Sequence, residues 1–108
     1  MKSNLKLIEN PRLSDFQEYV KAMEVERGFE DQNVLQKCLM LGEEVGELFK
    51  AIRKSEKLKI DYNSKFGSVE EELADITIYL CAIANRFDID LEKAFRDKEE
   101  RNKLRVWK

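Results

Sequence analysis

The feature that most constrains the fold is the spacing of apolar residues, which recur every three or four positions over most of the chain. Such spacing is typical of amphipathic helices, because it places the apolar side chains on one face. No stretch shows the alternation of a half-buried strand, and there is a single proline. We therefore expect an all-α fold, a four-helix bundle, formed by one domain over residues 1–108 with flexible ends at 1–12 and 104–108.

Residues that cap helices mark the expected boundaries. Ser14 or Asp15 can cap the first helix, a residue of Asp31–Asn33 the second, Ser68 the third, and Asp88 or Asp90 the fourth. Residues 56–67 lose the helical periodicity and are expected to form a loop. The third helix is apolar on nearly every side and should lie at the centre, whereas the highly charged fourth should lie outside. The periodicity predicts helices over about 14–27, 34–55, 68–87 and 91–102.

Two apolar stripes are the expected core. The first helix contributes Phe16, Tyr19, Val20 and Met23. The second contributes Val34, Cys38, Leu41, Val45, Leu48, Phe49 and Ile52. Because Cys38 and Cys81 lie in apolar helical patterns without a Cys-x-x-Cys spacing, we expect both to be buried, reduced thiols.

Composition excludes several classes of function. The 22 acidic and 20 basic residues leave a net charge of only −2, which argues against binding to duplex nucleic acid or an anionic membrane. The most apolar stretch, 73–84, is interrupted by an acid and is too short to span a bilayer, so we expect a soluble, cytoplasmic protein. The absence of histidine excludes histidine-based triads, histidine-ligated zinc and Glu-x-x-His di-iron sites.

Two pairs of acids stand out from this charged background because of their places on the expected helices. Glu44 and Glu47 share a face with apolar neighbours, whereas Glu43 points to the solvated side. Glu72 and Asp75 share a face with Tyr79, and Asp75 lies within the most apolar segment.

We expect Asp75 to be buried, and a buried carboxylate must be protonated, paired with a cation or bound to a metal. Four carboxylates on two antiparallel helices would bind a hard cation, Mg²⁺ or Mn²⁺. The alternative is that these acids form salt bridges with some of the many basic residues.

The segments LGEEVGELFKAI and EEELADITIYL resemble those of the MazG-type all-α nucleoside triphosphate pyrophosphohydrolases, and among them the small dCTP pyrophosphatases. The shared pattern is Glu44-x-x-Glu47, a gap of 24 residues, and Glu72-x-x-Asp75, with Tyr79 one turn further on. A C-terminal Lys98-x-x-x-Asn102-x-x-Arg105 is similar as well. The resemblance covers about residues 14–107.

This resemblance implies hydrolysis of a nucleoside triphosphate to the monophosphate and pyrophosphate, in nucleotide-pool housecleaning. The four acids, Glu44, Glu47, Glu72 and Asp75, would be both metal ligands and catalytic residues, and would bind Mg²⁺ or, alternatively, Mn²⁺. Lys98, Asn102 and Arg105 would contact phosphate and sugar. It also implies a homodimer or homotetramer. The residues that could recognise the base are Asn33, Phe29, Trp107 and Phe16, of which Phe16 is expected to be core.

Two other functions are compatible with the pattern. Phosphoribosyl-ATP pyrophosphohydrolase uses a similar pair of acidic helices, although the C-terminal segment favours the MazG type. A non-catalytic helical dimerisation or regulatory module could use the same carboxylates structurally, or bind an ion without turnover.

Overall fold

In the computed structural model, which describes residues 2–58 and 66–107, four helices follow one another and no strand occurs. They are α1 (Leu13–Arg27), α2 (Val34–Ser55), α3 (Val69–Arg86) and α4 (Leu91–Asn102). The expected all-α fold is thereby confirmed. The predicted loop over 56–67 lies partly outside the described residues. None of the described helices combines the length and the apolar composition needed to cross a membrane.

Three of the predicted helix starts are confirmed by side-chain caps. Asn33 accepts a hydrogen bond from the backbone N–H of Gln36 at 2.8 Å, and the Gln36 side chain accepts one from Asn33 N–H, also at 2.8 Å. Ser68 caps α3 in the same way, and Asp90 accepts from the first turn of α4. These local bonds satisfy donors that have no partner within the helix.

The start of α1 differs from the prediction. Arg12 occupies the N-cap position, ahead of the expected Ser14 or Asp15. Asp15 lies three positions inside, where its carboxylate accepts a hydrogen bond from Arg12 N–H at 2.8 Å. The acid therefore stabilises the helix start from within the first turn. The helix ends as predicted at Gly28, whose positive φ of 73° is the left-handed conformation that glycine adopts without steric cost.

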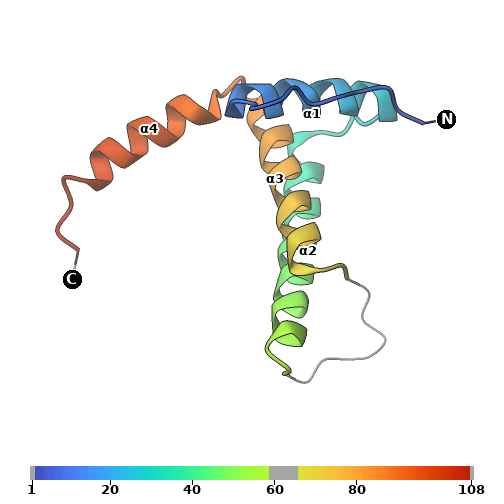
Figure 1. Cartoon of the computed structure of the whole chain (residues 1–108). Coiled ribbons are helices and arrows are strands. Elements are labelled where there is room, and N and C mark those ends of the chain that lie inside the picture. Colours follow the sequence, from blue (N-terminus) through green and yellow to red (C-terminus); the bar gives the residue numbers. More distant parts are fainter. Residues whose placement is uncertain (1, 59–65, 108) are drawn as a thin grey trace.

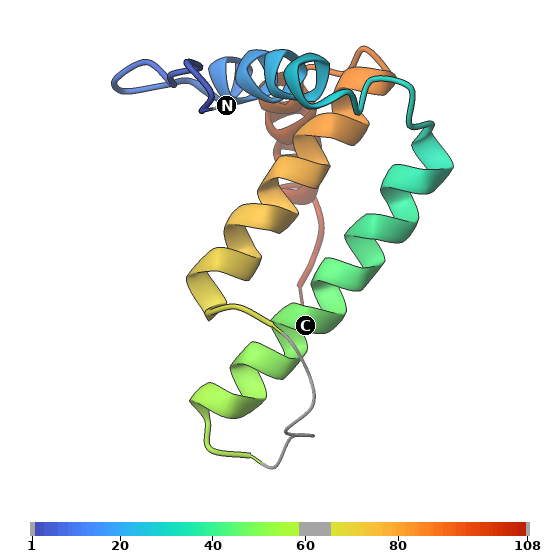
Figure 2. The same cartoon turned by 90° about the vertical axis from the view of Figure 1, so that its right-hand side faces the viewer.

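Helices α2 and α3 lie side by side and antiparallel, α1 crosses one end of this pair, and α4 leaves the body (Figures 1 and 2). The Cα radius of gyration is 16.5 Å. A compact chain of this length has about 13 Å. Because α4 leaves the body, much of the surface of the helices is not covered by another part of the described chain.

The core lies where α1 packs on α3. Its buried residues are Val20, Met23, Cys81 and Ala82, against which Leu5, Tyr19, Ile78 and Leu91 pack. Val20, Met23 and Cys81 are thus buried as expected.

Other expected core residues are exposed. Phe16 on α1 and Phe49 and Ile52 on α2 are exposed, and Cys38 is exposed instead of buried. The apolar face of α2 is wider than the strip that α3 covers, so the prediction was wrong for residues at its margins. Leu73 and Leu80 on the predicted central helix α3 are also about half exposed.

The side-chain amide of Gln17 holds the turn between α3 and α4. Its Nε2 donates to Ile89 O at 2.7 Å and to Asn85 Oδ1 at 3.2 Å, while its Oε1 accepts from Leu91 N–H at 3.0 Å. Asn85 Nδ2 donates in turn to Gln17 O at 2.9 Å. Because Gln17 is buried, these bonds are shielded from water and fix where α4 begins.

Candidate active site

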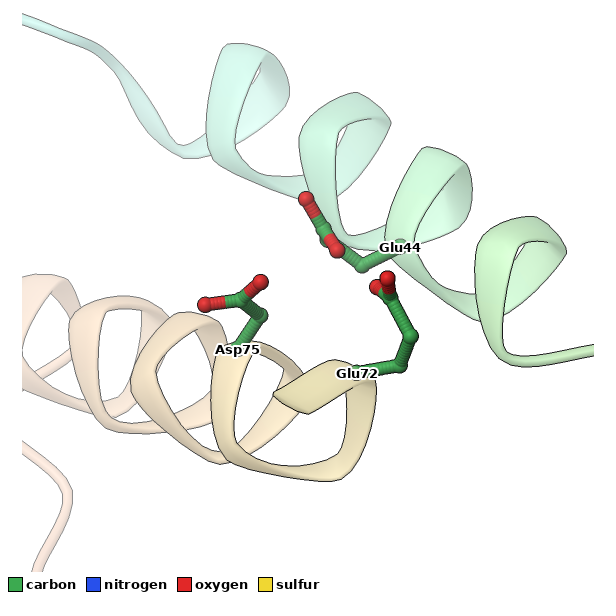
Figure 3. A group of neighbouring side chains, drawn as sticks. All are labelled: Glu44, Glu72 and Asp75. Atoms are coloured by element: carbon green, nitrogen blue, oxygen red, sulfur yellow. The ribbon is translucent and has the colours of Figure 1, made fainter. Parts of the chain in front are cut away.

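Three carboxylates from the paired helices converge on one point. Glu44 comes from α2, and Glu72 and Asp75 come from successive turns of α3 (Figure 3). One oxygen of each lies within 4.8 Å of one oxygen of the others. The Glu-x-x-Asp spacing places both acids of α3 on the side facing α2, as the helical period requires.

Burial within this acidic cluster, Glu44, Glu72 and Asp75, differs from expectation. Glu72 is the buried member, only 2% exposed, and Glu44 is partly buried. Asp75, which we expected to be buried, is exposed. Its apolar neighbour Leu73 is 50% exposed, because no described part of the chain covers that side of α3.

Two oxygens of the acidic cluster lack the partners that buried carboxylates normally have. Glu72 Oε1 accepts a hydrogen bond from Gly67 N–H at 2.5 Å. Glu72 Oε2 and Glu44 Oε2, by contrast, are buried and have no hydrogen-bond partner among the described residues while both carboxylates are ionised. An unpaired buried carboxylate oxygen is costly, and a hard cation is the ligand that carboxylates alone select. The donor set therefore fits Mg²⁺ or Mn²⁺.

The electrostatics of the cluster are those of crowded acids. Burial and the neighbouring Glu72 and Glu47 raise the pKa of Glu44 to about 8. Partial desolvation by the surrounding side chains, and then the Glu72 carboxylate, raise the pKa of Asp75. The pKa of Glu72 is lowered, chiefly by the hydrogen bond from Gly67 N–H. Full ionisation of the cluster at neutral pH is thus unfavourable until a cation compensates it.

The fourth predicted acid lies beside this group. Glu47 is not one of the three acids that meet within 4.8 Å, but burial and the carboxylates of Glu72 and Asp75 raise its pKa. It is therefore close enough to feel their charge. Glu43 is exposed and outside the group, in agreement with its expected outward direction.

Sequence reasoning missed a second charged cluster, made of Glu24, Lys37 and Arg86. Arg86 donates to both carboxylate oxygens of Glu24, at 2.8 and 2.9 Å, and Lys37 Nζ lies 2.9 Å from Glu24 Oε2. Lys37 and Glu24 are almost completely buried. A signal was present, since Lys37 precedes Glu44 by seven residues and so shares its helix face.

A small cavity lies between this charged cluster and the acidic one. It has a volume of about 100 Å³ and is lined by Lys37, Phe29, Tyr79 and Asp75, among others. The Lys37 ammonium lies 5.1 Å from the centre of the Phe29 ring and 5.5 Å from that of Tyr79. Tyr79 is one of the residues that the sequence predicted to bind substrate. Asn33, also predicted to bind substrate, is exposed and caps α2.

The predicted C-terminal substrate residues do not meet the acidic cluster within one chain. Lys98 and Asn102 line a groove between α3 and α4, on the helix that leaves the body (Figure 1). Arg105 lies over the Trp107 ring at 4.3 Å, and Trp107 Nε1 donates to Asn102 O at 3.1 Å. Among the described residues, no hydrogen bond or ion pair joins this segment to the acidic cluster.

Comparison with known proteins shows what the chain as a whole is similar to. The model of the MazG nucleotide pyrophosphohydrolase domain matches residues 30–106. The chain is also similar to two crystal structures of iMazG from Vibrio DAT 722. It is 36% identical to the C-terminally tagged form over 87% of this chain and 100% of that one, with a TM-score of 0.62. It is 35% identical to the N-terminally tagged form over 91% of this chain and 100% of that one, again with a TM-score of 0.62. Comparison with curated protein sequences gave no match.

The match over residues 30–106 shows that this all-α chain is a nucleotide pyrophosphohydrolase. It belongs to the MazG family, because the family model covers more than half of the chain and spans both acidic pairs. The resemblance read from the two segments is confirmed, and the reading as a non-catalytic module is set aside.

Proposed function

We propose that the protein hydrolyses a nucleoside or deoxynucleoside triphosphate to the monophosphate and pyrophosphate in a Mg²⁺-dependent reaction that serves nucleotide-pool housecleaning. The observation that carries the proposal is the acidic cluster, with buried oxygens of Glu44 and Glu72 that lack a hydrogen-bond partner among the described residues. In a member of this family, such a donor set is suited to a divalent cation and its phosphate ligands.

Glu44, Glu72 and Asp75 would hold the cation, and Glu47 would join them as its carboxylate becomes ionised. A cation held there would neutralise charge on the phosphate oxygens and acidify a water molecule for attack on the α-phosphorus. Gly67 N–H keeps Glu72 ionised and oriented, which fixes one ligand before substrate arrives. The other acids of the site would lose their protons when the cation binds, because its charge compensates theirs.

We further propose that the working form is a homodimer or larger homo-oligomer, in which a second copy covers the groove between α3 and α4. The groove has a volume of about 440 Å³ and is lined by Leu80, Leu91 and Phe95. Phe95 is 71% exposed and Leu80 46%. Exposed apolar residues that lie together often mark a site of contact with another protein chain.

A second copy would also explain the separation of the C-terminal segment from the acidic cluster. Lys98 and Asn102 lie on α4, which in Figure 1 leads away from the α2–α3 pair that carries the acidic cluster. In an oligomer, this segment could reach a partner's cluster and offset phosphate charge there. Sedimentation of the wild-type protein and of a Phe95→Glu variant tests the interface: a monomeric wild-type protein would contradict it.

Pyrophosphate release tests the catalytic proposal. The wild-type protein should release pyrophosphate from at least one member of a panel of canonical and modified triphosphates with Mg²⁺, but not with excess chelator. Asp75→Asn should remove this activity, because it removes a charged ligand while keeping the side-chain shape. Glu43→Gln is the matched control, since Glu43 is exposed and outside the acidic cluster. Full activity of Asp75→Asn would disprove the proposed site.

A further inference from the structure

The charges of the Glu24–Lys37–Arg86 cluster do not balance. One carboxylate faces two cations, and Arg86 alone already makes two hydrogen bonds to it. A bidentate guanidinium is the strongest partner that a carboxylate can have. The pairing of Glu24 therefore does not require Lys37, whose charge is left in excess within this cluster of three residues.

The Lys37 ammonium also has unused hydrogen-bonding capacity. An ammonium group carries three N–H donors. Among the described residues, Glu24 Oε2 is its only hydrogen-bonding or ion-pair partner, although the residue is only 3% exposed. By contrast, Arg86 also donates to backbone oxygens of Gln32, Phe29 and Ala82.

Stability does not account for a lysine at this position. Lysine is almost never fully buried unless it is paired. Lys37 also lies near the N-terminus of α2, where the partial positive charge of the helix end disfavours a cation. A methionine would fill the same space without a cost of desolvation. The lysine thus fits a requirement for a donor better than a requirement for packing.

The place toward which such a donor can act is the cavity between the two clusters. Lys37 lines it together with Asp75, which belongs to the acidic cluster, and with the rings of Phe29 and Tyr79. Its volume of about 100 Å³ is too small for a whole nucleotide but can receive the edge of an aromatic heterocycle. Aromatic rings, a buried donor and a neighbouring phosphate site together suit a nucleobase.

We propose that Lys37 is a specificity-determining residue, whose ammonium donates a hydrogen bond to a carbonyl oxygen on the base of the bound nucleotide. Glu24, held by Arg86, positions this ammonium in the cavity. The inference rests on the proposed function, because it assumes that the phosphates lie at the acidic cluster. A lysine donates only, so the site favours bases that carry a ring carbonyl over adenine, which has none.

The test compares Lys37→Met with wild-type protein on ligands with and without a base. The ligands are hydrolysis-resistant α,β-imido deoxynucleoside triphosphates and the matching deoxyribose triphosphate without a base, titrated by calorimetry with Mg²⁺. Pyrophosphate release from the corresponding hydrolysable compounds is measured in parallel. Lys21→Met is the control, since Lys21 is exposed on α1 and does not line this cavity.

Lys37→Met should weaken binding of the preferred carbonyl-bearing nucleotide by about 10- to 100-fold, the range for loss of one charged hydrogen bond, and leave the base-free ligand unchanged. The preference over the adenine nucleotide should fall with it. The variant should fold, because Glu24 keeps Arg86. Lys37→Leu, which also has no hydrogen-bond donor, gives the same comparison should the methionine variant unfold.

An equal loss for ligands with and without a base would overturn the inference, because it would show a structural or phosphate-binding role. The inference would also be overturned if the variants kept the wild-type ratio of affinities for the carbonyl-bearing and the adenine nucleotide. A wild-type protein that binds nucleotides but releases no pyrophosphate would refute the proposed function alone, and Lys37 would then be judged by the binding ratios. A wild-type protein that binds no nucleotide would refute both.

Discussion

Replacing Glu44 by glutamine should stabilise the metal-free protein at alkaline pH. Glu44 has a pKa of about 8 in the folded chain, against an ordinary value of 4.5, because of burial and the neighbouring carboxylates. Between these values the unfolded chain loses its proton first, so rising pH favours unfolding. The stability conferred by protonated Glu44 is therefore fully present below pH 4.5 and is lost as the pH rises through about 8.

The magnitude follows from the size of the shift. A change from 4.5 to about 8 corresponds to about 5 kcal/mol if fully expressed. Glu44 is only partly buried, and screening by solvent reduces this to about 1–2 kcal/mol. For a domain of this size, that difference raises the midpoint of thermal unfolding by about 5–10 °C.

Thermal unfolding followed by circular dichroism measures this effect, at one protein concentration, with chelator or with Mg²⁺. With chelator, Glu44→Gln should melt above the wild-type protein at a pH of about 8.5, and the gap should close at a pH of about 4. Mg²⁺ at a hundred times its dissociation constant should stabilise the wild-type protein by about 2.7 kcal/mol and the variant by much less.

Glu43→Gln is again the control and should follow the wild-type curve. A variant that melts at or below the wild-type temperature at alkaline pH in chelator would refute the reasoning. A gap that stays constant from acid to alkaline pH would do so as well, because it would show an effect of packing instead of ionisation.

Two further predictions concern the surroundings of the site. Arg86→Met should lower the free energy of unfolding by about 3–5 kcal/mol in urea titrations, because it leaves the buried Glu24 with Lys37 alone. Arg96→Met removes an exposed ion pair and should lower the free energy of unfolding by less than about 1 kcal/mol, so similar losses for the two variants would contradict the prediction. Gly67→Ala should weaken Mg²⁺ binding several-fold in calorimetry, because the added Cβ would lie 3.1 Å from Glu72 Oε1. Gly46→Ala, with no atom within 4 Å of its Cβ, is the control. An unchanged affinity of Gly67→Ala for Mg²⁺ would contradict the prediction.

The parts of the fold that depend on local sequence were predicted well. Ser68 and Asp90 cap their helices as expected, since a cap needs only residues a few positions away. The start of α1 was missed because Asp15 can act from inside the first turn as well as from the cap. The pattern of acids could also be read, because the helical period alone brings Glu72 and Asp75 to one side of α3.

The parts that depend on tertiary neighbours could not be read in this way. Periodicity shows that Cys38 and Phe49 lie on an apolar face, but not how much of that face another helix covers. Asp75 was expected to be buried from its neighbours in sequence, whereas its exposure depends on what packs over α3. The ion pairs of Glu24 join residues more than a dozen positions apart, and no local pattern specifies such a pairing.

Helix α1 gives no carboxylate to the acidic cluster, yet its Gln17 determines the direction in which the chain continues after α3. The amide both donates and accepts there, so an ionised glutamate at this position would lose the bond to Ile89 O. A single substitution at Gln17, which lies outside the acidic cluster, would therefore change the direction of α4 and of the residues that follow it. The placement of Lys98 and Asn102 on α4 therefore depends on a side chain of α1 that takes no part in the acidic cluster.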